Sequence, residues 1–153
     1  MAQGTGTLMR VVVVNGPNLN LLGSREPSIY GKTSLADIEA MVRASAAKLN
    51  LAVEFVQSNH EGVLVDIVQG LSARCDAAIV NLGGYTHTSV ALRDAFLAAP
   101  LPFIEVHLSN LFAREEVRQR SMTADLAIGV ITGLGAQGYL LALEALVAAH
   151  SDG

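Results

Sequence analysis

The sequence predicts an α/β fold in which helices cover both faces of a five-stranded parallel sheet. Five short apolar stretches alternate with segments of helical spacing, and most of the connections between them are short. The 153 residues are 51% hydrophobic, which is enough apolar material for one full core. These apolar residues are mostly Ala, Val, Leu and Ile, a composition typical of buried parallel strands.

The first strand is expected at 9–15 (MRVVVVN), where four valines follow one another. A helix follows at 34–50, with Ser34 as its N-cap and Asn50 at its end. The segment 51–57 (LAVEFVQ) alternates apolar and polar residues, which predicts the second strand.

The middle of the chain continues the alternation. A helix is expected at 60–74, and Ser58 with Glu61 fits a capping box at its start. The continuous apolar run at 76–81 (DAAIVN) indicates a central strand. The next helix is expected at 87–99.

The last third of the chain supplies two more strands. The fourth strand is expected at 101–107 (LPFIEVH). A short helix follows at 109–121, with Ser109 or Asn110 as its N-cap. The fifth strand is expected at 126–132 (LAIGVIT) and the last helix at 136–149.

Length, charge and cysteine content restrict the class of protein. One domain at 9–150, preceded by a disordered extension at 1–8, accounts for the chain. The net charge is -4 and no basic run is present, so nucleic acid is not an expected partner. Neither a membrane-spanning stretch nor a signal peptide is expected. Cys75 is the only cysteine, which excludes an intrachain disulfide and favours a cytoplasmic protein.

The flavodoxin-like strand order 2-1-3-4-5 is the natural prediction for this three-layer arrangement, and it places a site. In such sheets, ligands bind at the carboxyl ends of the strands, near the switch between strands 1 and 3. Strands 1, 3 and 4 are expected to end at Asn15, Asn81 and His107. The polar stretches 15–31 (NGPNLNLLGSREPSIYG) and 81–89 (NLGGYTHTS) should therefore meet in one crevice beside His107.

This crevice combines two possible acid–base groups, neutral hydrogen-bonding groups and excess positive charge. Such a mixture suits an anionic, hydroxylated small molecule. Besides the strand ends, the candidate residues are Asn18, Arg25, Tyr30, His87, Glu105, Ser109, Arg114 and Arg118.

Other motifs fit less well. The stretch 133–138 (GLGAQG) matches the dinucleotide pattern, but the further strand and acidic residue that the pattern needs do not follow it. A tight turn with close helix packing is the better interpretation. Ser89 or Ser109 near a histidine would suit a hydrolase, but the G-x-S-x-G elbow is missing. The four histidines have neither paired spacing nor a cysteine partner, so no metal site is expected.

Five stretches together resemble a known family. They are NGPNLNLLGSREPSIYG, QSNHEG, GGYTHTSVALRDA, IEVHLSN with ARE, and GVITGLGAQGYLLAL, and they extend over about residues 11 to 147. In content and order they are similar to type II 3-dehydroquinate dehydratase. The resemblance implies a flavodoxin-like fold, no cofactor, and a homododecamer built of trimers.

By this resemblance, Tyr30 is the catalytic base and His107 the general acid. An ordinary phenol has a pKa of about 10, so the base needs nearby cations, and Arg25 and Arg114 are the candidates. Asn18 corresponds to the residue that helps to hold a water near the developing enolate.

The resemblance also implies substrate contacts. Asn81 and the backbone amides of Leu108 and Ser109 correspond to the carboxylate site, and a helix N-terminus is independently suited to an anion. His87 and Arg118 correspond to residues that hold the substrate's hydroxyl groups.

Two carboxylates, Glu105 and Asp94, each have two possible roles. Glu105 and His107 lie two residues apart on one face of a strand, so Glu105 could orient or charge the imidazole, or it could pair with Arg114. Asp94 corresponds to a residue that reaches a neighbouring subunit's site, but an ordinary surface carboxylate fits equally well.

The implied reaction is the dehydration of 3-dehydroquinate to 3-dehydroshikimate, a step of the shikimate pathway of aromatic amino-acid biosynthesis. The phenolate of Tyr30 removes the proton α to the ketone, and His107 protonates the departing β-hydroxyl. The stretch 15–31 then acts as a lid whose first part, around Asn18, is fixed beside the sheet. Its middle, 23–31 (GSREPSIYG), carries Arg25 and Tyr30 and has Gly23 and Gly31 as hinges.

The segment 116–125 (EVRQRSMTAD) is the weakest part of the match. Relatives commonly carry a histidine and an aromatic residue near Gln119, Arg120 and Met122, which leaves the details around Arg118 open.

A ligand-binding or signalling module on the same fold is the alternative from another class of protein, since a fold does not determine a function. Tyr30 with Arg25 favours the enzyme, because a pure binding module needs no activated phenol opposite a histidine. The sequence leaves open whether the pathway is biosynthetic or catabolic.

Overall fold

The structure is a computed structural model and describes residues 8–24 and 32–152. Its sheet consists of β1 (Met9–Asn15), β2 (Leu51–Gln57), β3 (Ala77–Asn81), β4 (Phe103–His107) and β5 (Gly129–Thr132). All neighbouring strands are parallel, and their order is β2-β1-β3-β4-β5. The predicted α/β fold and strand order are therefore confirmed.

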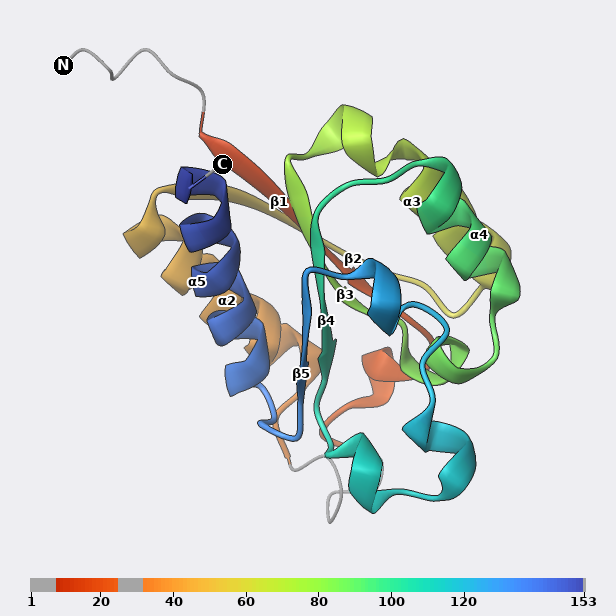
Figure 1. Cartoon of the computed structure of the whole chain (residues 1–153). Coiled ribbons are helices and arrows are strands. Elements are labelled where there is room, and N and C mark those ends of the chain that lie inside the picture. Colours follow the sequence, from red (N-terminus) through yellow and green to blue (C-terminus); the bar gives the residue numbers. More distant parts are fainter. Residues whose placement is uncertain (1–7, 25–31, 153) are drawn as a thin grey trace, which may run out of the picture.

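In the described part of the chain, helices cover both faces of the sheet (Figure 1). They are α2 (Leu35–Leu49), α3 (Glu61–Arg74), α4 (Val90–Ala98) and α5 (Gln137–Asp152). Helices α2 and α5 pack together on one face, and α3 and α4 pack together on the other. None of the described helices has the length and apolarity that crossing a membrane requires.

The run of valines in β1 explains why the sheet has a core on each face. Val11 and Val13 belong to the cluster under α2 and α5, whereas Val12 and Val14 belong to the cluster under α3 and α4. All four are at most 1% exposed. Successive side chains of a strand point to opposite faces, so a central strand must be apolar throughout.

Helix α2 begins and ends at the expected residues. Ser34 Oγ accepts from the amide of Asp37 at 3.0 Å, and Asp37 Oδ2 accepts from the amide of Ser34 at 3.0 Å, which is a complete capping box. Asn50 ends the helix in the left-handed conformation, with φ at 60°.

The capping box predicted at Ser58 and Glu61 is wrong. Ser58 Oγ accepts from the amide of His60, and His60 itself is the N-cap residue of α3. Glu61 instead accepts from Ser89 Oγ at 2.5 Å, because α3 and α4 lie side by side. A tertiary contact has replaced the local bond at this helix start.

The helix predicted at 109–121 is also wrong. The structure has two short 3-10 turns there, η4 (Leu111–Ala113) and η5 (Glu116–Gln119), followed by η6 (Ala124–Leu126). A regular helix would continue away from the sheet, whereas this segment returns to it at Ser121, whose hydroxyl bonds Glu105 on β4. The predicted cap is right, because Asn110 Oδ1 accepts from the amide of Phe112 at 3.1 Å.

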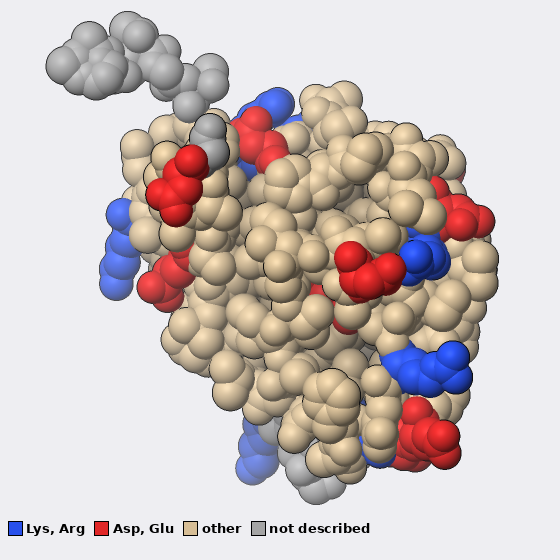
Figure 2. Space-filling view, viewed as in Figure 1, with Lys and Arg blue, Asp and Glu red and all other residues tan. Residues whose placement is uncertain are grey.

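Strand β5 is an edge of the sheet, and its flank exposes apolar side chains. Ile128 and Val130 are 55% and 44% exposed. Figure 2 shows this face of the molecule, where uncharged residues cover most of the area and charged side chains form small separate groups. An apolar sheet edge of this kind is a surface that another chain can cover.

Candidate active site

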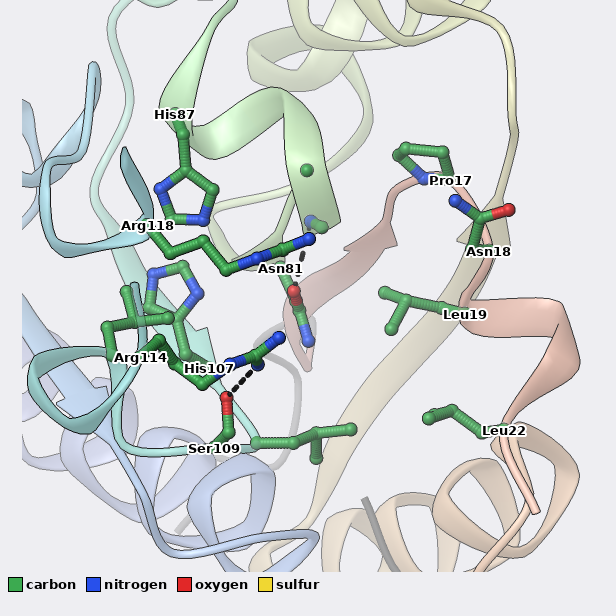
Figure 3. Close-up of a pocket in the computed structure, with 14 residues that line it drawn as sticks. Pro17, Asn18, Leu19, Leu22, Asn81, His87, His107, Ser109, Arg114 and Arg118 are labelled. Atoms are coloured by element: carbon green, nitrogen blue, oxygen red, sulfur yellow. Dashed lines mark hydrogen bonds between the residues drawn. The ribbon is translucent and has the colours of Figure 1, made fainter. Parts of the chain in front are cut away.

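A pocket lies at the edge of the sheet where β1, β3 and β4 end, as the strand order predicts. Figure 3 shows Asn18 and two leucines on one side of it, and two histidines and two arginines on the other. The predicted site residues that line this pocket are Asn18, Asn81, His87, His107, Leu108, Ser109, Arg114 and Arg118.

The loops after β1 and β3 meet backbone to backbone at this pocket. Gly16 donates its amide to the carbonyl oxygen of Asn81 at 2.7 Å, and a Cβ atom at Gly16 would lie 2.2 Å from the carbonyl oxygen of Leu82. Gly83 has a φ of +59°, and a Cβ atom there would lie 2.9 Å from the carbonyl oxygen of Pro17. Only glycine permits such an approach, so these two positions hold the loops together.

Asn18 is held in the left-handed conformation, with φ at 68°, which asparagine tolerates better than most residues. Its amide donates to Asn59 Oδ1 at 2.9 Å, and Gln57 Nε2 donates to the same oxygen at 3.1 Å. Gln57 also donates to the carbonyl oxygen of Gly16 at 3.1 Å. The end of β2 and the residues after it therefore fix the backbone of Asn18 beside the pocket.

Strand β4 supplies a buried acid–base pair. His107 Nε2 and Glu105 Oε2 are 2.7 Å apart, and the side chains are 5% and 2% exposed. Glu105 Oε1 accepts from Thr123 Oγ1 at 2.6 Å and from Ser121 Oγ at 3.0 Å. Burial raises the pKa of Glu105, but the hydrogen bonds from His107, Thr123 and Ser121 outweigh it and bring the pKa below its ordinary value. Both carboxylate oxygens are thus engaged, and Glu105 orients His107.

The rings of His87 and His107 stack at the pocket, with centroids 6.3 Å apart. His87 Nδ1 lies 2.7 Å from the carbonyl oxygen of Arg120, and because a carbonyl only accepts, Nδ1 carries the proton. Burial lowers the pKa of His87, and the bond to Arg120 offsets only part of this effect. His87 is therefore neutral at pH 7 and leaves Nε2 as a hydrogen-bond acceptor. In His107, Nε2 faces Glu105, so Nδ1 is the ring nitrogen that remains for a ligand.

Two arginines give the pocket its positive charge. Arg114 Nη1 donates to Ser109 Oγ at 2.9 Å, and Arg118 Nε lies 3.1 Å from Glu115 Oε1. The described part of the lining includes both arginines and no carboxylate. This imbalance favours an anionic ligand.

The segment after β4 turns its amides away from the β5–α5 turn. The carbonyl oxygens of His107 and Leu108 accept from the amides of Gly133 and Gly135, at 3.2 and 3.0 Å. In a trans peptide the N–H points opposite to the C=O, so the amides of Leu108 and Ser109 point away from these glycines. Both residues line the pocket. These backbone bonds, and not a helix dipole as the sequence predicted, align the two amides.

The GLGAQG stretch forms the predicted tight turn. Gly133 has a φ of +92°, and a Cβ atom there would lie 3.0 Å from Asn110 Cβ. A Cβ atom at Gly138 would lie 3.2 Å from Ile131 and 3.3 Å from Val106, so α5 packs closely on the sheet. The glycines serve the turn and the packing, as expected for a stretch that is not a nucleotide fingerprint.

Some of the predicted residues are not found in the described pocket lining. Arg25, Tyr30 and the hinge residue Gly31 lie outside the described residues. Asp94 is exposed on α4 and is not part of the lining. Among residues 8–24 and 32–152, no three His, Cys, Asp or Glu side chains are grouped so as to hold a metal ion.

Comparison with known proteins assigns the family. The model of the family described as Dehydroquinase class II matches residues 9–147. The chain belongs to the class II dehydroquinase family. It is 59% identical to the 3-dehydroquinate dehydratase of Chelativorans sp. (strain BNC1) over 139 residues, 90% of this chain and 96% of that protein. It is 53% identical to the catabolic 3-dehydroquinase of Verticillium alfalfae over 135 residues, 88% of this chain and 90% of that protein.

Solved structures agree with this family. The type II dehydroquinase from Butyrivibrio crossotus superimposes with a TM-score of 0.89 at 41% identity, over 92% of this chain and 99% of that one. The type II dehydroquinase from Propionibacterium acnes has a TM-score of 0.86 at 38% identity, over 93% of this chain and 99% of that one. The flavodoxin-like fold of this class II dehydroquinase is thus shared with its relatives.

In the atypical segment of this class II dehydroquinase, residues 120 and 122 make their described contacts through the main chain. The carbonyl oxygen of Arg120 binds His87, and the carbonyl oxygen of Met122 accepts from Arg93 Nη1 at 2.8 Å. The amide of Met122 donates to the carbonyl oxygen of Thr86 at 2.8 Å. Any residue can provide these backbone groups, so the unusual side chains at 120 and 122 leave the described contacts intact.

Sequence reasoning missed several residues behind the site. They include Ser121 and Thr123 under Glu105, Asn59 beside Asn18, and Tyr139 beside Asn81. Small hydroxyl residues at 121 and 123 gave no signal, because their partner is distant in sequence. A tyrosine in the otherwise apolar face of α5 was a usable signal, since a buried phenol needs a hydrogen-bond partner.

Replacing Glu105 with glutamine is expected to lower the free energy of unfolding by about 1–3 kcal/mol at pH 7, because charge-assisted hydrogen bonds in a buried site are lost. The folded-state pKa of Glu105 is lowered from 4.5, so its contribution is present above about pH 4.5 and is lost as the pH falls through the folded-state value. Urea unfolding at several pH values should show a difference between the proteins that shrinks on acidification. The exposed Glu144→Gln is the control, and an equal effect in both variants would contradict the prediction.

Proposed function

We propose that this protein converts 3-dehydroquinate to 3-dehydroshikimate and water, as a type II 3-dehydroquinate dehydratase. The observation that carries the proposal is the buried Glu105–His107 pair at the wall of a cationic pocket, in a chain whose family match extends over residues 9–147. The relatives named for this reaction are 50–59% identical over most of the chain, which makes a change of reaction class a poor alternative.

The proposed reaction separates the base from the acid. Tyr30, as phenolate, takes the proton α to the ketone and an enolate forms, with a water held by Asn18 as its hydrogen-bond donor. The protonated imidazole of His107 then gives its Nδ1 proton to the β-hydroxyl group, which leaves as water. The carboxylate of Glu105 keeps the ring in place through its contact with Nε2.

The remaining groups fit the polar substituents of the substrate. The amide side chain of Asn81 and the amides of Leu108 and Ser109 bind the carboxylate, and Arg118 and His87 bind the ring hydroxyls. His87 accepts a hydrogen bond from one hydroxyl through Nε2, because Nδ1 is already bound to the carbonyl oxygen of Arg120. Arg114, with Arg25 from the lid at 15–31, supplies the positive charge that favours the phenolate of Tyr30.

Assembly and location belong to the same proposal. We expect a homododecamer of trimers in which Asp94 on α4 reaches the site of a neighbouring subunit. The apolar flank of the edge strand β5 supports burial by another chain. A cytoplasmic location in the shikimate pathway suits a protein whose one cysteine, Cys75, is a buried thiol.

The test is a direct assay. Chelator-treated protein is mixed with 3-dehydroquinate, and the ultraviolet absorbance of the conjugated enone product is followed. We expect rapid product formation without any added metal or cofactor. An absence of product from correctly folded and assembled protein would remove the dehydratase proposal and favour a binding module on the same fold.

A further inference from the structure

A chain of hydrogen bonds lies buried between α5 and the ends of the two central strands. Tyr139 Oη is 2.7 Å from Asn15 Oδ1 and 3.0 Å from Asn81 Nδ2. Beyond these, Asn15 Nδ2 is 3.2 Å from the carbonyl oxygen of Val56, and Asn81 Oδ1 is 3.1 Å from the amide nitrogen of Gly83. Tyr139 and Asn15 are 0% exposed and Asn81 is 3% exposed.

Backbone groups at the two ends fix the direction of every bond in this chain. The carbonyl of Val56 can only accept, so Asn15 turns its amino group to Val56 and its oxygen to Tyr139. The amide of Gly83 can only donate, so Asn81 turns its oxygen to Gly83 and its amino group to Tyr139. The hydroxyl of Tyr139 must therefore donate to Asn15 and accept from Asn81.

This arrangement determines what Asn81 offers to the pocket that it lines. Its oxygen is bound to Gly83 and one of its two N–H groups is bound to Tyr139. The second N–H is the group left for a ligand, so Asn81 acts as a donor and selects an acceptor such as a carboxylate. A rotated side-chain amide would present an oxygen and repel the same ligand.

We propose that Tyr139 is a positioning residue for the carboxylate subsite, because its hydroxyl holds the amino group of Asn81 in the orientation that binds an anion. The inference rests on the proposed function for the identity of the anion, the carboxylate of 3-dehydroquinate. Tyr139 does not line the described pocket and acts only through Asn81.

The phenol of Tyr139 stays neutral in this position. Burial raises its pKa well above the ordinary value for tyrosine, and the hydrogen bond from Asn81 offsets only a small part of this effect. The hydroxyl group therefore keeps its proton, and its role as a donor to Asn15, over the whole range in which the enzyme is assayed.

The Tyr139→Phe variant tests the proposal, since it removes the hydroxyl and keeps the ring that stacks on Phe55. We expect KM for 3-dehydroquinate to rise about tenfold, as for the loss of one hydrogen bond to a charged group. We expect kcat to change less than about threefold, because the carboxylate is bound equally in the ground state and the transition state. The control is Tyr85→Phe, which removes a hydroxyl outside the pocket lining and should leave KM unchanged.

A double-mutant cycle with Asn81→Ala separates positioning from a general loss of stability. If Tyr139 acts through Asn81, the Tyr139→Phe change should raise KM by less than about twofold in the Asn81→Ala background. An unchanged KM in Tyr139→Phe, or a full tenfold effect on top of Asn81→Ala, would overturn the proposal. If Tyr139→Phe fails to fold, the double variant Asn15→Leu/Tyr139→Phe is tested instead. It replaces both members of the buried Tyr139–Asn15 hydrogen bond with apolar residues, so neither is left without its partner.

A crystal structure of Tyr139→Phe tests the positioning role of Tyr139 without any measurement of activity. Without the hydroxyl, the bond from Gly83 alone restrains this side chain, so we expect the side-chain amide of Asn81 to turn away from its wild-type orientation. Wild-type protein that forms no 3-dehydroshikimate would remove the proposed function alone, and the orientation of Asn81 in this variant would still test the role of Tyr139. An Asn81 that keeps its orientation would refute that role.

Discussion

Replacing His107 with asparagine is expected to lower kcat for 3-dehydroquinate by about 10²- to 10⁴-fold, the usual contribution of a positioned general acid. The imidazole is buried, its Nε2 faces the ionised Glu105 at 2.7 Å, and its Nδ1 is the nitrogen left for the pocket. Asparagine keeps polar atoms near this position but has no group that can transfer a proton at neutral pH. The loss should fall mainly on kcat, because the proton is delivered only in the transition state.

The matched control is His150→Asn, at an exposed position near the end of α5 and outside this pocket. We expect its kcat to stay within about twofold of the wild type. A His107→Asn enzyme with nearly full kcat would show that another group protonates the leaving hydroxyl, and His87 would be the first to test.

The layers of the fold were predictable because the spacing of apolar residues along the sequence shows which faces of each strand and helix are buried. The four valines of β1 are apolar on both faces since both faces are covered. The helix expected at 109–121 could not be excluded in this way. Its local sequence suits a helix, and only the distant contact of Ser121 with Glu105 shows why the chain turns back to the sheet.

The residues that line the pocket were predictable, but the residues that support them from behind were not. Asn81 and His107 follow from the rule that parallel strands end at one edge, together with polar residues at those ends. Tyr139 lies 58 residues from Asn81 and 124 residues from Asn15, and no local pattern joins residues so far apart. The same holds for Thr123, which lies 18 residues from its partner Glu105. Residues that support a site through tertiary contacts become visible only when the elements are placed.

The described tyrosines narrow the choice of catalytic base. The chain has three tyrosines. Tyr139 is fully buried, and burial raises its pKa, so it cannot take a proton from a substrate in the pocket. Tyr85 donates its hydroxyl to the carbonyl oxygen of Asn59 at 3.1 Å and does not line the pocket. In the proposed reaction the base is Tyr30, the residue that the family resemblance implies, which lies outside the described residues.

Replacing Tyr30 with phenylalanine is therefore expected to reduce kcat by about 10²- to 10⁴-fold, because no other phenol can replace the lost base. Tyr85→Phe is the matched control and should keep nearly full activity. Exchange of the substrate's α-proton with deuterated solvent, followed by NMR, separates proton abstraction from the later loss of water. The Tyr30 variant should lose exchange and dehydration together. The His107 variant should keep exchange if the enolate forms reversibly before the hydroxyl departs. Exchange at the wild-type rate without Tyr30 would assign the base to another residue and leave the dehydratase proposal itself standing.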